Sequence, residues 1–111
     1  MQRHSRQHPT PEKAFAKVLR SARTERGLSQ EQLGFESGYH RTYIGMLERG
    51  LMNPTLRTIL SVASALETPA GELVGRVEAL VGSDWRRPQP SEDRIRAQSP
   101  QAERSRKHPI K

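Results

Sequence analysis

Cysteine is absent from the 111-residue chain, which excludes disulfide bonds and thiolate chemistry. No apolar run approaches the ~20 residues that a membrane-spanning helix needs. The N-terminal stretch MQRHSRQHPTPEK lacks the apolar centre of a secretion signal. These absences predict a cytoplasmic protein without a membrane partner. The low apolar content predicts a folded core of only ~70 residues, a size at which small domains are marginally stable.

The sequence also has few of the residues that enzymes use. Its four histidines are His4, His8, His40 and His108, and no two of them have the helical spacing of a metal site with an acid beside them. There is no glycine-rich phosphate loop and no nucleophile with a plausible base. We therefore expect no enzymatic activity, no metal site and no cofactor.

Negative charge is scarce, with 12 acids against 19 lysines and arginines and a net charge of +7. Residues 1–11 contribute +2, residues 12–83 contribute +1 and residues 84–111 contribute +4. Such an excess favours polyanionic partners such as nucleic acid. Composition predicts a flexible arm over 1–11, a folded domain over 12–83 and a disordered basic tail over 84–111.

Helical periodicity dominates the middle segment, and no stretch alternates with the period of a strand. The expected fold is therefore all-α, a compact domain of five helices. Gly27 is expected to end the first helix and Gly38 the second, because glycine adopts the left-handed conformation without steric cost. The third helix is expected over His40 to Arg49, with Gly50 after it.

Capping residues mark the expected helix starts. Ser29 with Gln32 forms a capping box for the second helix. Thr55 should cap the fourth helix, and Thr68 the fifth, with Pro69 in its first position. The expected apolar residues of these last two helices are Leu56, Ile59, Leu60, Ala63 and Leu66, followed by Leu73, Val74, Val77, Leu80 and Val81.

The third helix has two unlike faces. At ~100° per residue, Ile44, Leu47 and Glu48 lie on the inward side. Arg41 lies between the two faces, in the first turn, where a long side chain can reach forward. The outward side has no carboxylate and so can approach a polyanion. Its residues are Thr42, Gly45, Met46 and Arg49.

The segment Gln30 to Arg49 resembles the helix-turn-helix of lambda-repressor-like (Cro-like, XRE family) DNA-binding domains, and the resemblance extends from Phe15 to Leu80. It departs from the pattern at Gly34, where alanine is usual. We expect this glycine to cost up to ~1 kcal/mol of helix stability without changing the geometry. The residues that match the motif's apolar, small and glycine positions are Leu33, Gly34, Gly38, Ile44 and Leu47.

The resemblance implies a transcriptional regulator of prokaryotic type that binds double-stranded DNA sequence-specifically. Helix 40–49 would enter the major groove, and the protein would be nucleoid-associated when bound. Expected base contacts are Arg41, Thr42, Gly45 and Met46. Expected phosphate contacts are Gln30, Tyr43, Arg49, Asn53, Thr55 and Arg57. Alternatives remain for three of these residues: Arg41 would contact only a phosphate, Met46 would be idle, and Tyr43 would only pack.

The resemblance also implies a structural pair between Arg23, at the end of the first helix, and Glu48. The inward direction of Glu48 agrees, because a buried carboxylate needs a partner. The alternative is two solvated surface charges, which would contribute little.

Regulators of this kind often bind as dimers that read two half-sites. A homodimer interface is expected on the fifth helix through Leu73, Val77 and Leu80, which would otherwise only close the monomer core. A second hypothesis is an antitoxin or adaptor whose tail over 84–111 binds a protein partner. The operator sequence and the sign of regulation do not follow from the residues.

Overall fold

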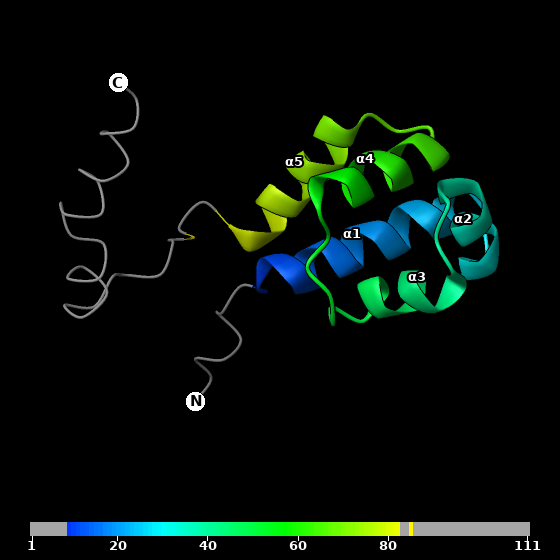
Figure 1. Ribbon diagram of the computed structural model, residues 1–111. Coiled ribbons are helices and arrows are strands. Elements are labelled where there is room, and N and C mark those ends of the chain that lie inside the picture. Colours follow the sequence, from blue (N-terminus) through cyan, green and yellow to red (C-terminus); the bar gives the residue numbers. More distant parts are fainter. Residues whose placement is uncertain (1–8, 83–84, 86–111) are drawn as a thin grey trace, which may run out of the picture.

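Five α-helices form the described part of the chain, which comprises residues 9–82 and Trp85 of the computed structural model (Figure 1). Within these residues there is no strand, so the predicted all-α, five-helix fold is confirmed. The greater parts of the predicted arm and tail lie outside the described residues. The helices are α1 (Pro11–Glu25), α2 (Gln30–Ser37), α3 (Arg41–Glu48), α4 (Leu56–Ala65) and α5 (Ala70–Val81).

Side-chain caps start four of the five helices. Thr10 accepts a hydrogen bond from the backbone N–H of Lys13, so α1 begins at Pro11, just before the expected domain start at residue 12. The Ser29–Gln32 capping box is present with both of its hydrogen bonds. Thr55 caps α4 as predicted. His40 caps α3, because its side chain accepts from the backbone N–H of Thr42.

The predicted cap of α5 by Thr68 is wrong. Pro69 occupies the N-cap position and no side chain caps the helix. The backbone N–H of Thr68 instead donates to the Ala63 carbonyl at 3.0 Å, and its hydroxyl donates to the Leu66 carbonyl at 3.2 Å. Thr68 therefore closes the C-terminal end of α4, where Glu67 adopts a φ of 55°.

The core lies between α1 and the helices around it. α1 packs against α3 and α5, while α2 packs against α3 and α4 (Figure 1). This arrangement leaves the outward side of α3 uncovered by the other helices. The buried cluster consists of Phe15, Val18, Leu19, Ala22, Leu33, Ile44, Leu47, Val62, Ala63, Leu66 and Leu73.

The predicted apolar stripe of α4 is only partly buried. Leu56 and Leu60 have 71% and 52% of their surface exposed. The inward row is Thr58, Val62 and Leu66, three residues spaced four apart, all of which are buried. The helix is rotated so that the Thr58 hydroxyl turns inward, where it has hydrogen-bond partners, and this rotation leaves the two leucines on the surface.

The expected interface residues of α5 share one side of the helix but differ in burial. Leu73 is 0% exposed and belongs to the core, and Val77 packs against it. These two residues close the monomer, which was the alternative left open by the sequence. Leu80 is exposed, at 37%, but it borders a groove beside α1 with Lys17 and Val18. The expected interface through Leu73 is therefore wrong.

Gly34 has a larger role than its helix propensity indicates. A Cβ atom at this position would lie 2.5 Å from the Tyr39 carbonyl oxygen and 3.2 Å from the Arg41 backbone nitrogen. Cβ atoms essentially never lie as close as 2.5 Å to another heavy atom, and the atom in question belongs to the backbone, so a side chain would push α2 away from the turn into α3. The expectation that Gly34 leaves the geometry unchanged is wrong.

Candidate nucleic-acid interface

α3 is anchored to the body of the protein by its inward face. Ile44 and Leu47 are fully buried and pack in the core. The His40 Nδ1 atom accepts from the Thr42 backbone N–H at 3.0 Å, which satisfies one of the free donors of the first turn. The helix is thus fixed at its start and along one side, while its other side faces outward.

A buried ion pair fixes the end of α3. Arg23 donates from Nε to Glu48 Oε2 at 2.6 Å and from Nη2 to Glu48 Oε1 at 2.9 Å. Its Nη1 donates to the Leu28 carbonyl at 2.8 Å. The hydrogen bonds to Glu48 raise the pKa of the Arg23 guanidinium, so this cation stays protonated. The arrangement implied by the family resemblance is present.

Gln30 joins this network from the first turn of α2. Its Nε2 donates to Glu48 Oε1 at 3.0 Å, so the carboxylate receives three hydrogen bonds. The ends of α1 and α3 and the start of α2 are therefore tied to one buried carboxylate. One amide hydrogen and the Oε1 atom of Gln30 take no part in this bond and stay free for a ligand.

A groove of about 480 Å³ runs beside the outward face of α3. Arg41 and Thr42 are exposed at its rim, and Gly45 is half-buried. The Nη1 of Arg41 lies 3.6 Å from Glu31 Oε1, with both side chains exposed. Such a pair contributes little and is easily exchanged for another partner. The lining residues are Arg20, Gln30, Arg41, Thr42, Gly45, Glu48 and Arg49.

Gly45 is not required by the fold. A Cβ atom there would meet only the Gln30 side chain, with its Oε1 at 3.5 Å, an ordinary contact. A glycine in the middle of a helix costs about 1 kcal/mol relative to alanine. The missing side chain instead keeps the groove open towards anything that approaches α3 from outside.

Tyr43 and Thr55 belong to a cluster of four hydroxyls, in which three surround the hydroxyl of buried Thr58. The Thr58 Oγ1 lies 3.2 Å from the Tyr39 hydroxyl, 3.3 Å from the Tyr43 hydroxyl and 3.0 Å from Thr55 Oγ1. The two tyrosine rings are 5.0 Å apart. We call these four residues the hydroxyl cluster. It joins α3 to the first turn of α4, and its hydroxyls already have partners inside the protein.

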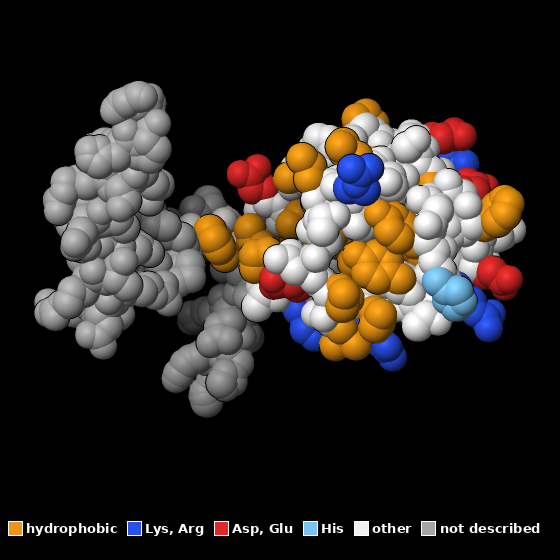
Figure 2. Space-filling model, viewed as in Figure 1, with side chains coloured by type: hydrophobic (Ala, Val, Ile, Leu, Met, Phe, Trp, Pro, Cys, Tyr) orange, Lys and Arg blue, Asp and Glu red, His pale blue; other side chains and the backbone are white. Residues whose placement is uncertain are grey.

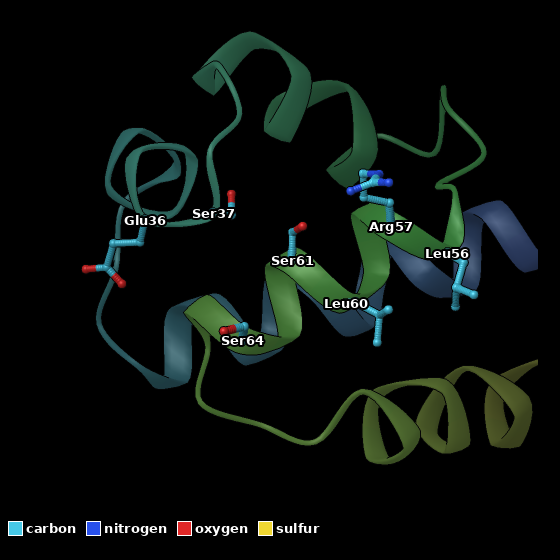
Figure 3. A pocket seen from close by; sticks show the side chains of 7 residues that line it. All are labelled: Glu36, Ser37, Leu56, Arg57, Leu60, Ser61 and Ser64. Carbon is cyan, nitrogen blue, oxygen red and sulfur yellow. The ribbon is translucent and has the colours of Figure 1, made fainter.

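The remaining predicted residues lie on α3 or in the segments that follow it. Met46 is half-buried on α3, and Arg49, Asn53 and Arg57 are exposed. In Figure 3 Arg57 points to the side of α4 where α2 and α3 lie, whereas Leu56 points to the other side. Figure 2 shows lysine and arginine side chains along the edge formed by α3 and the start of α1. The structure thus gathers most predicted contacts around one helix.

Sequence reasoning missed three residues of this region. Tyr39 and Thr58 complete the hydroxyl cluster, and Arg20 lines the groove from α1. Thr58 stands four residues before Val62, and this spacing was the available signal. The described helices include none that is long and apolar enough to cross a membrane. The described residues also hold no group of three metal-binding side chains.

Comparison with known proteins places the chain in a family. Residues 19–73 match the family model described as helix-turn-helix, HTH_3. Control protein C.SmaI of Serratia marcescens is 48% identical over 62 residues, which cover 56% of this chain and 74% of that protein. Control protein C.BamHI of Bacillus amyloliquefaciens is 38% identical over 61 residues, which cover 54% and 75%.

A solved structure agrees with this placement. The restriction-modification controller protein C.AhdI from Aeromonas hydrophila is 47% identical, with a TM-score of 0.55. The match covers 56% of this chain and 94% of that one. The fold and the uncovered face of α3 define a helix-turn-helix DNA-binding protein. The chain belongs to the XRE-type helix-turn-helix family and is a sequence-specific, double-stranded DNA-binding transcription regulator.

Proposed function

We propose that the chain is a controller protein of a restriction-modification system and regulates transcription as a homodimer on an operator. The observation that carries the DNA-binding part is the outward face of α3, cationic and held rigid from behind by the Arg23–Glu48 pair. The resemblance to C.SmaI and C.AhdI supports the controller role. We assign no catalytic activity to the chain, and its place of action is the cytoplasm, on the nucleoid.

α3 supplies the base contacts in this proposal. Arg41 donates two hydrogen bonds to guanine O6 and N7, once its exposed pair with Glu31 has exchanged. Thr42 and Met46 offer apolar contacts to thymine methyl groups. Gly45 allows the helix to lie close to the base edges, which explains a glycine that the fold does not need.

Phosphate contacts flank α3 and set its register. We propose direct contacts by Gln30, Arg49, Asn53 and Arg57, on both sides of the helix. Gln30 lines the same groove as Arg49. Arg49 and Arg57 have no acidic partner within the part of the chain that the structure describes.

The hydroxyl cluster supplies one further phosphate contact. Its four hydroxyls have four hydrogens, and the three contacts around Thr58 use three of them. One hydrogen therefore remains, on Tyr39, Tyr43 or Thr55. We propose that Tyr43 and Thr55 share this single donor towards one phosphate.

The dimer interface is proposed on an α4–α5 apolar surface made of Leu56, Leu60 and Val74, which are 71%, 52% and 43% exposed. Figure 3 shows both leucines on the side of α4 that faces α5. Val74 lies on the flank of α5 opposite Leu80, because the buried row through Leu73 separates them at ~100° per residue. Three large exposed aliphatic residues on two adjacent helices are typical of a surface that a second copy covers.

Selection of bound duplexes from a random library tests the proposal. We expect an enriched palindrome with half-sites about 34 Å apart centre to centre, and a guanine preference that Arg41→Ala removes. Arg76→Ala on α5, far from α3, is the matched control and should leave the preference intact. Recovery of unenriched sequences by the wild-type protein would contradict sequence-specific binding through α3.

A further inference from the structure

Arg20 is an exposed cation that the proposed contacts do not use. It lies on α1, yet it lines the groove beside α3 together with Gln30 and Arg49. No acidic side chain in the described part of the chain forms an ion pair with it. Its guanidinium is therefore a free donor group at the mouth of the groove.

Among the described residues that line the groove, no acidic side chain is free to form an ion pair with Arg20. Glu48 is the sole acid among the described lining residues, and its carboxylate already receives three hydrogen bonds from Arg23 and Gln30. Arg20 stands three residues before Arg23 on α1 and so lies on a neighbouring part of the same helix face. One of these two arginines neutralises the buried carboxylate, and the other remains available for an anion from outside.

Three elements converge on this end of the groove. α1 contributes Arg20, the first turn of α2 contributes the free amide hydrogen of Gln30, and the C-cap of α3 contributes Arg49. A planar guanidinium beside further donors suits a phosphate diester, because its N–H groups match two phosphate oxygens.

We propose that Arg20 binds a DNA backbone phosphate at the edge of the major groove, beside the phosphate held by Gln30. This inference rests on the proposed docking of α3. It makes α1 a second DNA-contacting element, which anchors the duplex to the body of the domain as well as to the recognition helix. Arg20 adds affinity and register and leaves the base preference unchanged.

The test compares Arg20→Gln with Lys17→Gln, using the selected duplex and a random-sequence duplex. Lys17 is the matched control, because it is an exposed, unpaired cation on the same helix that borders the α1–α5 groove instead. Both variants remove one positive charge from the surface. Affinity is measured as a function of salt, and folding is checked by thermal unfolding of both variants.

We expect Arg20→Gln to lower the slope of log affinity against log salt by about 1, the value for one lost phosphate contact. Affinity should fall several-fold on both duplexes, with the base preference unchanged. Lys17→Gln should keep the wild-type slope. Equal slopes for the two variants, with wild-type binding intact, would overturn the proposed phosphate contact of Arg20 and leave the proposed function standing. Absence of duplex binding by the wild-type protein would overturn the proposed function as well.

Discussion

Arg23 and Glu48 are 25 residues apart in sequence, yet they are joined by two side-chain hydrogen bonds of 2.6 and 2.9 Å. This bidentate pair connects the end of α1 to the end of α3, and Gln30 adds a third bond from α2. The carboxylate of Glu48 is almost completely buried. The position of the recognition helix relative to the rest of the domain therefore depends on a charge pair that solvent barely reaches.

We predict that Arg23→Ala destabilises the domain by about 3 kcal/mol, because it leaves a buried carboxylate without its cation. Urea denaturation, with the midpoint read at constant slope, measures the loss. The control is Arg76→Ala, which removes an exposed pair with Glu72 on one face of α5 and should cost less than ~1 kcal/mol. Similar losses for the two variants would show that the Arg23 pair behaves as a surface pair.

Replacement by alanine should change the free energy of unfolding in opposite directions at two helical glycines, Gly45 and Gly34. Gly45→Ala should raise the free energy of unfolding by up to ~1 kcal/mol, because the helix gains propensity and its new Cβ meets no close atom. Its affinity for duplex DNA should fall at least several-fold, because the methyl group holds the helix away from the bases. Thermal unfolding and a binding titration on one preparation measure both effects.

Gly34→Ala should instead destabilise the protein by about 1 kcal/mol or more. The strain of a Cβ atom 2.5 Å from the Tyr39 carbonyl exceeds the gain in helix propensity, since overpacking typically costs 1–3 kcal/mol. A more stable Gly34→Ala variant would show that the α2–α3 turn relaxes easily. An unchanged DNA affinity in Gly45→Ala would contradict the proposal that Gly45 lets α3 lie close to the base edges.

The hydroxyl cluster gives a third prediction. Thr58→Val keeps the shape of the side chain but removes the atom that all three neighbouring hydroxyls contact. We expect a loss of about 1–2 kcal/mol in the free energy of unfolding. Thr58→Ser retains the hydroxyl and should lose less. If the serine variant were as unstable as the valine variant, the methyl group of Thr58 would contribute as much to stability as its hydroxyl.

Local signals explain which features could be predicted from the sequence. The caps at Ser29 and Thr55 depend only on residues within one turn, and the Arg23–Glu48 pair follows from the spacing of a known motif. The rotation of α4 could not be predicted, since an apolar stripe does not say which of its flanks turns inward. The Thr58 hydroxyl turns inward, where two of its partners are Tyr39, from the turn between α2 and α3, and Tyr43, from α3. Residues this far from Thr58 in the sequence leave no local signal.

Arg20 was missed for a related reason. The groove that it lines is formed by three elements that are far apart in sequence, so no local pattern marks the residue. Leu73 illustrates the opposite error. Its place in an apolar helix fitted both a core and an interface, and only the packing of α5 on α1 decided that it is buried. Sequence periodicity finds the apolar side of a helix, but neighbouring helices decide how much of that side is covered.

The last prediction concerns the α4–α5 apolar surface. Leu60→Glu places a charge on the exposed side of α4 that faces α5 and should convert a dimer into a monomer, because the carboxylate would be desolvated against a second copy. Leu80→Glu is the matched control, since Leu80 lies on the opposite flank of α5 beside Lys17. Sedimentation equilibrium over a range of concentrations measures the dissociation constant of each.

We expect Leu60→Glu to weaken dimerisation at least tenfold and Leu80→Glu to leave it close to wild type. The free energy of unfolding should change little in either case when measured on monomers, because both side chains are already exposed. Loss of the dimer should also weaken binding to a two-half-site duplex far more than to a single half-site, since the second contact becomes a separate binding event. If Leu80→Glu dissociates the dimer while Leu60→Glu does not, the interface lies on the α1 side of α5, and the two half-sites must be read with the α3 helices in a different relative orientation.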